Sequence, residues 1–187
     1  QEKRHVQSFA DVGCGSGEML VSLTAGFPDK VFYGYDPSRS IIEKNMQKAS
    51  SIANFAFEVA PLPDLCEVKR TFDLVTCFRT LRYVAEAEKT LIRLYELVNH
   101  GGFLVFDYPD YWYYLQTRRS ISQYQYGTEQ EKRSWLELYE PLLSKRNLLT
   151  QRGIRRVLEG KMEVLDGRYR HNILLLIQKA WAPRRRL

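Results

Sequence analysis

The sequence predicts an α/β domain, in which a mainly parallel sheet carries helices on both faces. Three observations support this class. From Gln7 to Tyr108, short apolar segments alternate with segments of helical spacing, which is typical of strand–helix–strand units. The segment Phe72–Phe78 is almost continuously apolar, as in a strand that is buried on both faces. Glycines follow the first apolar segment, where the chain must turn sharply from a strand into a helix.

In the first half of the chain we expect strands and helices in alternation. The expected strands are the apolar segments 7–12, 31–35 and 54–58. The first helix, over 16–26, has apolar side chains at helical spacing. The second helix runs to about Ala49 and begins at one of two serines. Ser40 and Glu43 have the spacing of a capping box, and Ser38 is the alternative N-cap.

Two further strands are expected in the second half, at 72–78 and 103–108. A helix over 85–98 lies between them, because apolar residues recur there at helical spacing. Gly101 and Gly102 are expected to stop this helix before the next strand begins.

Beyond Tyr108 the composition changes. The segment of about 109–160 is rich in Tyr, Trp and Arg and is expected to be a mostly helical insert. Residues 181–187 form a basic tail. Gly167 separates two apolar segments that predict a closing β-hairpin, 161–166 and 172–179. We expect the whole chain, 1–187, to form a single domain.

The composition is that of a globular protein, with 44% hydrophobic and 27% charged residues. No apolar run approaches the ~20 residues that span a bilayer, and the polar segment Gln1–His5 does not resemble a signal peptide. A cytoplasmic protein without a membrane partner is therefore expected. The odd, widely spaced cysteines, Cys14, Cys66 and Cys77, fit neither a disulfide framework nor a zinc site, and no metal is expected.

The net charge of +6 is carried mostly by arginines late in the chain. A basic balance is compatible with RNA or with an anionic substrate as the partner. A modest excess of this size is also what solvated surface arginines produce.

The glycine spacing in the loop Asp11–Gly17 indicates which class of nucleotide-binding site the loop belongs to. The dinucleotide fingerprint G-x-G-x-x-G needs a glycine where Glu18 stands. The phosphate-binding Walker pattern is absent as well, because no Gly-Lys-Ser/Thr follows. The loop resembles motif I of the class I S-adenosylmethionine-dependent methyltransferases, acidic-x-G-x-G-x-G, at every fixed position.

This resemblance extends over roughly Ser8 to Ala180. Phe72-Asp73-Leu74-Val75 and the turn Val98–Phe103 are similar to the fourth strand and the turn into the fifth strand of that family, with His100 in place of its usual proline. The resemblance implies a Rossmann-like, seven-stranded sheet that is mostly parallel, with an antiparallel last strand and an aromatic-rich helical insert after strand five.

The resemblance also implies S-adenosyl-L-methionine as the cofactor and a set of residues that bind it. Asp11 would offer negative charge to the cationic donor, and a bare glycine backbone would admit its methionine part. Asp36 ends the second strand, where a carboxylate can accept both ribose hydroxyls, and Glu58 is similar to the acid that approaches the adenine amino group. The expected cofactor-binding residues are Asp11, Gly13, Cys14, Gly15, Gly17, Asp36, Pro37, Glu58 and Cys77.

The acceptor site is expected beside the ends of the fourth and fifth strands. The catalytic candidates there are Asp107 and Tyr108, as acid/base or orienting groups, and Arg79, which with Arg82 is placed to face an anionic acceptor. Arg82 has the alternative of being a solvated residue at a helix entry. The fourth strand does not end in Asn/Asp-Pro-Pro-aromatic, which disfavours amino-purine and amino-pyrimidine methylation.

The aromatic segment after Pro109 allows several acceptors. As a lid it could hold a flat or amine small molecule, or it could stack on unpaired RNA bases; packing of the insert on the sheet is the alternative. The expected function is methyl transfer to a small molecule. The alternatives are an RNA-directed methyltransferase, a nucleotide-dependent oxidoreductase and a non-catalytic cofactor-binding subunit.

Overall fold

The structure is a computed structural model that describes residues 6–62, 65, 68–84, 86–109, 128–130, 133, 137, 151–158, 162–169 and 172–179. Its strands are β1 (Ser8–Val12), β2 (Val31–Asp36), β3 (Phe55–Val59), β4 (Phe72–Cys77), β5 (Val98–Pro109), β6 (Met162–Tyr169) and β7 (Asn172–Lys179). Its helices are α1 (Glu18–Gly26), α2 (Arg39–Lys48), the short 3-10 helix η1 (Leu81–Tyr83), α3 (Ala87–Glu96) and α6 (Gln151–Leu158). The predicted α/β class is confirmed.

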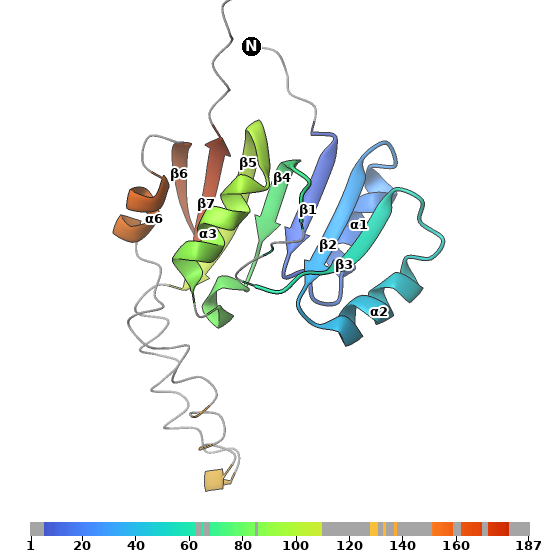
Figure 1. Ribbon diagram of the computed structural model, residues 1–187, viewed down its shortest axis with the longest axis horizontal. Coiled ribbons are helices and arrows are strands. Elements are labelled where there is room, and N and C mark those ends of the chain that lie inside the picture. The colour runs from blue at the N-terminus through green and yellow to red at the C-terminus, as the bar shows by residue number, and fades with distance from the viewer. Residues whose placement is uncertain are drawn as a thin grey trace, which may run out of the picture.

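The strands form one sheet in the order β3-β2-β1-β4-β5-β7-β6 (Figure 1). Strands β1 to β5 run parallel to one another, and β7 pairs antiparallel with both β5 and β6. The chain winds outward from β1 to β3, then returns to the other side of β1 with β4. The neighbouring carboxyl ends of β1 and β4 are therefore the switch point at which open α/β sheets bind their ligands.

Helices cover both faces of the parallel part of the sheet (Figure 1). Side chains that alternate along each strand divide the core into two buried clusters. One cluster joins sheet residues such as Tyr35 and Phe72 to Leu91 and Leu94 of α3 and to Ile154 of α6. The other joins Phe9, Phe32 and Phe57 to Leu20 of α1 and Ile42 of α2. The sheet is thus the middle of three layers.

The expected helix end at Val98 is two residues too late, and the expected strand start at Phe103 is five residues too late. Leu97 is already the C-cap of α3, and β5 begins at Val98, so Gly101 and Gly102 lie inside a strand instead of stopping a helix. The register between β4 and β5 shifts at this point. A Cβ on Gly102 would come within 2.7 Å of the Asp73 carbonyl oxygen, so the glycine allows the irregular strand to pack closely.

Asp73 holds this irregular segment in place. Its carboxylate accepts hydrogen bonds from Asn99 Nδ2 at 2.8 Å and from the backbone nitrogens of Gln7 at 2.9 Å and Ser8 at 3.1 Å. Partial burial opposes ionisation, but these hydrogen bonds hold the pKa of Asp73 below its usual range. The start of β1 is thereby tied to β4 and β5.

Two smaller expectations also change. Gly167 pairs with Leu174 inside β6 and is not the hairpin turn. Ser38 is the N-cap of α2, and its side chain makes no capping hydrogen bond to the helix, so the Ser40–Glu43 capping box is not formed.

Of the insert over 109–160, α6 is the described helix; most of the insert and the basic tail lie outside the described residues. No helix among the described residues is long and apolar enough to span a membrane.

Candidate functional site

The glycine loop leaves the end of β1 in an alternating left-handed conformation. Gly13, Gly15 and Gly17 have φ angles of 78°, 50° and 70°, a region that L side chains rarely adopt. The backbone nitrogens of Gly13 and Cys14 both donate to the Tyr35 carbonyl oxygen, at 2.7 and 3.0 Å. Gly17 is the N-cap of α1. The three glycines therefore bend the chain around the end of β2 before the helix begins.

The three glycines differ in what a side chain at each position would contact. A Cβ on Gly13 would lie 2.1 Å from Thr80 Oγ1, and one on Gly17 would lie 2.3 Å from the ring of Phe57. These two glycines admit neighbouring parts of the protein. A Cβ on Gly15 would meet nothing within 4 Å. Gly15 is thus the glycine that leaves open space beside the loop.

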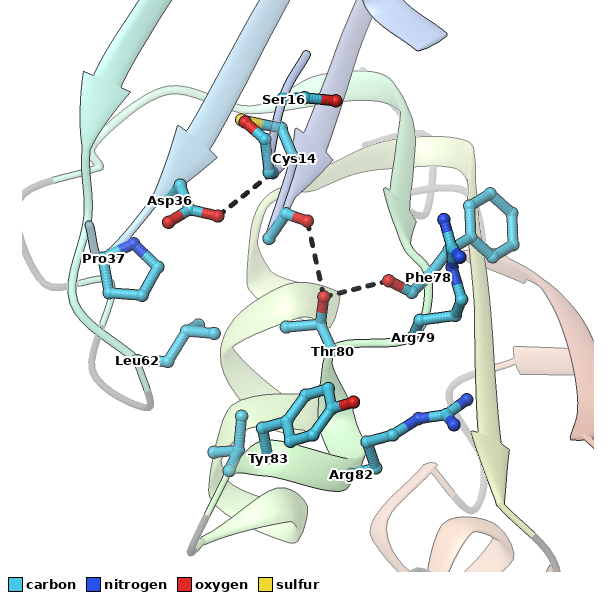
Figure 2. Close-up of a pocket in the computed structure, with 13 residues that line it drawn as sticks. Cys14, Ser16, Asp36, Pro37, Leu62, Phe78, Arg79, Thr80, Arg82 and Tyr83 are labelled. Carbon is cyan, nitrogen blue, oxygen red and sulfur yellow. Dashed lines mark hydrogen bonds between the residues drawn. The ribbon is translucent and has the colours of Figure 1, made fainter. Parts of the chain in front are cut away.

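Asp36 fastens the glycine loop to the end of β2. Its Oδ2 accepts a hydrogen bond from the Gly15 nitrogen at 3.1 Å (Figure 2), and its Oδ1 accepts one from the Ser38 nitrogen at 2.9 Å. The carboxylate therefore holds both the loop and the start of α2.

Asn45 completes the support of Gly15 and was not predicted from the sequence. Its Nδ2 donates to the Gly15 carbonyl oxygen at 2.6 Å, and the residue is only 1% exposed. The only available signal was a polar residue three positions after Ile42, on the buried face of α2. Asp36 and Asn45 together hold the nitrogen and the oxygen of the same glycine.

Asp11 lies beneath the loop and is 6% exposed. Burial raises the pKa of Asp11 to about 6; the Thr76 hydroxyl, which donates to Asp11 Oδ1 at 2.6 Å, acts against this, and the Asp36 carboxylate adds to it. This carboxyl group is thus partly protonated near neutral pH, and a nearby cation would favour its charged form.

The two described cysteines have different surroundings. Cys14 is half-buried in the loop, where burial and the charges of Asp11 and Asp36 raise its thiol pKa. Cys77 belongs to the buried core, and burial followed by the charges of Asp11 and Asp107 raises its pKa. Both remain neutral thiols and are poor nucleophiles.

The loop after β4 forms the wall opposite Asp36. Arg79 has a left-handed φ of 54° although it is not a glycine. The Asp107 carboxylate accepts a hydrogen bond from the Arg79 backbone nitrogen, and Asp107 Oδ2 lies 3.5 Å from an Arg82 guanidinium nitrogen. Thr80 Oγ1 donates to the Phe78 carbonyl oxygen at 3.0 Å and to the Gly13 carbonyl oxygen at 3.5 Å. This loop is therefore joined to β5 on one side and to the glycine loop on the other.

A cavity of about 730 Å³ opens between these walls at the carboxyl ends of β1, β2 and β4. Figure 2 shows Asp36 and Pro37 on one side and Arg79, Arg82 and Tyr83 on the other. The predicted site residues that line the cavity are Gly13, Cys14, Gly15, Asp36, Pro37 and Arg79. The lining residues outside that predicted set are Ser16, Leu62, Phe78, Thr80, Arg82, Tyr83 and Val84.

The other predicted site residues lie behind or beside the cavity. Gly17 packs against Phe57, and Asp11 lies under the loop. Cys77 and Tyr108 are in the core because their side chains point to the face that α3 covers. The predicted aromatic lid after Pro109 lies outside the described residues.

Glu58 and Asp107 each form an ion pair with an arginine. Glu58 forms an ion pair with Arg70 and is not among the cavity-lining residues. Arg70 also lies over the Tyr33 ring, 4.8 Å from its centroid. Arg82 is not the solvated residue of the alternative interpretation, because its side chain is 13% exposed and pairs with Asp107, which is 9% exposed.

Comparison with known proteins identifies the family of this chain. Residues 10–104, about half of the chain, match a family described as a methyltransferase domain. The trans-aconitate 2-methyltransferase of Deinococcus radiodurans is 30% identical over 107 residues, which are 57% of this chain and 40% of that protein. The malonyl-[acyl-carrier protein] O-methyltransferase of Halalkalibacterium halodurans is 23% identical over 136 residues, which are 70% of this chain and 50% of that protein. The chain spans half or less of the length of these relatives.

A solved structure shares the fold over nearly the whole chain. An S-adenosylmethionine-dependent methyltransferase from Clostridium acetobutylicum superposes with a TM-score of 0.67 at 15% identity. The match covers 94% of this chain and 85% of that one. At this identity the likeness concerns the fold.

Proposed function

The chain belongs to the methyltransferase domain family, and from this premise we propose that it transfers a methyl group from S-adenosylmethionine to a small-molecule acceptor. S-adenosylmethionine is the cofactor of this family and of the solved relative that shares its fold. The observation that carries the proposal is the cavity at the β1–β4 switch point, lined by the left-handed glycine loop and Asp36.

The residues at the β1 and β2 ends fit this cofactor. Gly15 leaves open space where a side chain would stand, so the methionine part of the cofactor can approach the backbone. Each Asp36 oxygen accepts one hydrogen bond from the protein and has a second lone pair for a ribose hydroxyl. Asp11 supplies negative charge beneath the site when it is ionised.

The protein's own contribution to the reaction is alignment. Bound S-adenosylmethionine supplies a methyl group that its sulfonium makes electrophilic. Side chains of the β4 loop, among them Phe78, Tyr83 and Val84, wall the cavity and would orient the acceptor toward that group. The role of Asp107 is revised to a positioning one, because its carboxylate already binds the Arg79 backbone and Arg82.

The organisation of the chain is part of the proposal. We assign β7 as the antiparallel strand that completes the seven-stranded sheet of this family, and residues 1–187 as one methyltransferase domain with an insert after β5. Support comes from the single hydrogen-bonded sheet that contains both β1 and β7. The free thiols of Cys14 and Cys77 support a cytoplasmic location.

A small-molecule acceptor is supported by the matched relatives, which are named for trans-aconitate and for a malonyl group on its carrier protein. The RNA-directed alternative rests on the net charge of +6. It requires RNA affinity to fall steeply as salt rises, so filter binding of single-stranded RNA across ionic strength separates the two.

Calorimetric titration of the intact chain with S-adenosylmethionine tests the proposal. We expect saturable binding of one molecule per chain, with S-adenosylhomocysteine competing for the same site. Titration with NADH serves as the control for a dinucleotide site. Absence of binding by both sulfur ligands, or tighter binding of NADH, contradicts the proposal.

A further inference from the structure

We propose that the β4 end of the cavity is a receptor for a carboxylate group of the acceptor, with Arg79 as the contacting cation. The inference rests on the proposed function and adds the chemical class of the acceptor. It comes from the distribution of charge along the cavity and from the unusual backbone of one residue.

The charges that line the cavity are separated. Asp36 is at the β2 end, beside the glycine loop, whereas Arg79 and Arg82 are at the β4 end (Figure 2). The proposed function places the methyl donor beside the glycine loop and Asp36, and its sulfonium is disfavoured at the arginine end. The arginine end is therefore left to the acceptor, and its charge selects an anion.

The two arginines are not equivalent. Arg82 is largely buried and its charge is balanced by Asp107, with 3.5 Å between the guanidinium nitrogen and the carboxylate oxygen. Among the described residues, no carboxylate pairs with the Arg79 guanidinium. Arg79 is thus the lining arginine whose positive charge is available to a bound anion, and its guanidinium can bind a carboxylate through two parallel hydrogen bonds.

The backbone around Arg79 is held in a conformation that a long side chain disfavours. Its φ of 54° is left-handed, and Asp107 accepts the hydrogen bond from its nitrogen. Residues kept in such conformations by their surroundings cluster at ligand sites. Asp107 therefore acts as a positioning residue: it balances Arg82 and fixes the backbone from which Arg79 enters the cavity.

The other side chains at the β4 end of the cavity indicate the chemical nature of the rest of the acceptor molecule. Phe78, Val84 and Leu62 provide apolar surface, and Tyr83, which also lines the cavity, is 53% exposed. An acceptor that carries a carboxylate on a small apolar or planar body matches both features.

The experiment compares acids with their neutral amides. The chain saturated with S-adenosylhomocysteine is titrated calorimetrically with benzoate and benzamide, and with malonate and malonamide. We expect at least one acid to bind about tenfold more tightly than its amide. Arg79→Asn should abolish this preference, since Asn tolerates the left-handed backbone but has no charge. Arg79→Lys should retain part of it, because the charge stays and the planar fork is lost.

Arg156→Asn is the matched control. It removes the same charge from an exposed arginine of α6 that pairs with Glu88, away from the lining residues, and should leave the acid preference intact. Equal binding of acids and amides by the unmodified chain overturns the inference. An acid preference that survives Arg79→Asn, or that falls equally in Arg156→Asn, overturns it as well.

The two proposals fail separately. If S-adenosylhomocysteine does not bind, methyl transfer is contradicted, and the acid–amide comparison without it still decides whether the anion site exists. If S-adenosylhomocysteine binds and no acid preference is found, the function stands and the carboxylate receptor falls. Should Arg79→Asn fail to fold by circular dichroism, Arg79→Gln replaces it with the same expected result.

Discussion

Asp36 accepts a hydrogen bond from the backbone nitrogen of Gly15, with 3.1 Å between that nitrogen and Asp36 Oδ2. The glycine that leaves open space in the cavity is therefore held by the carboxylate that we assign to the ribose. Asn45 holds the other side of Gly15, through its carbonyl oxygen at 2.6 Å. The shape of the loop and the proposed recognition of the cofactor therefore depend on the same contacts.

The first prediction concerns the open space at Gly15. Gly15→Val places a branched side chain where the methionine part of the cofactor is expected, on a backbone with φ of 50°. We expect S-adenosylmethionine binding to fall below calorimetric detection. Gly26→Val is the control, because a Cβ there also meets nothing within 4 Å and Gly26 does not line the cavity. Retained affinity in Gly15→Val would show that the loop is not the methionine site.

The second prediction concerns the charge of Asp36. Asp36→Asn keeps the shape of the side chain but removes the carboxylate that would accept the ribose hydroxyls. Hydrogen bonds to charged groups contribute about 1.5–3 kcal/mol, so we expect affinity for S-adenosylhomocysteine to fall about tenfold to hundredfold in calorimetry. Asp29→Asn, at an exposed carboxylate outside the cavity, should bind normally. An unchanged affinity in Asp36→Asn would contradict the ribose assignment.

The third prediction separates the glycines by stability. Gly13→Ala and Gly15→Ala both place a Cβ on a left-handed backbone, but only the Cβ at residue 13 overlaps a neighbour, Thr80 Oγ1 at 2.1 Å. We expect urea unfolding to show Gly13→Ala less stable than Gly15→Ala by about 1–3 kcal/mol, the usual cost of an overpacked side chain. The double variant Gly13→Ala/Thr80→Gly should recover part of the loss. Equal stability of the two single variants would contradict the assigned contact.

The fourth prediction follows from the raised pKa of Asp11. Burial, reinforced by Asp36, raises this pKa to about 6 from an ordinary value of 3.8, so the folded state binds the proton more tightly than the unfolded state. The Asp11 contribution to the free energy of unfolding therefore falls as pH rises from about 4 to about 6, by on the order of 3 kcal/mol, and is constant outside that window.

The measurement is urea unfolding of the unmodified chain and of Asp11→Asn from pH 3.5 to pH 7.5. Asn keeps an oxygen that can accept the Thr76 hydroxyl but does not titrate. The difference in unfolding free energy between the two proteins should shift in favour of Asp11→Asn between pH 4 and pH 6. A difference that is flat with pH would mean that Asp11 has an ordinary pKa.

The sequence predicts the residues that line the glycine-loop side of the cavity better than those that line the β4 side, for a physical reason. The glycine spacing and Asp36 are local features, because they sit at the ends of consecutive strands and need no knowledge of distant contacts. Thr80 and Asn45 reach the glycine loop from the loop after β4 and from α2, and only the folded sheet brings them there. Tyr108 and Asp107 are neighbours in sequence, yet strand alternation puts Tyr108 in the core and lets Asp107 reach the β4 loop.

Helix and strand ends are hardest to predict at glycines, because a glycine can either end a helix or allow close packing in an irregular strand. Gly101 and Gly102 have the composition of a helix stop, but the close approach of Gly102 to the Asp73 backbone shows that they serve an irregular strand. The hydrogen bonds that Asp73 accepts from Asn99 and from the start of β1 are long-range contacts. No window of the sequence contains them, so β5 was predicted to begin too late.

The last prediction tests Asp107 as a positioning residue. Asp107→Ala leaves Arg82 without its carboxylate partner at a site where both side chains are largely buried, and it removes the acceptor of the Arg79 nitrogen. Breaking a buried pair from one side costs about 3–5 kcal/mol, so we expect a loss of that order in urea unfolding. Arg82→Met/Asp107→Ala should recover part of it, since no charge is then left unbalanced. If Asp107 were instead a solvated acid/base group, Asp107→Ala would change the unfolding free energy by less than about 1 kcal/mol, and the double variant would show no recovery.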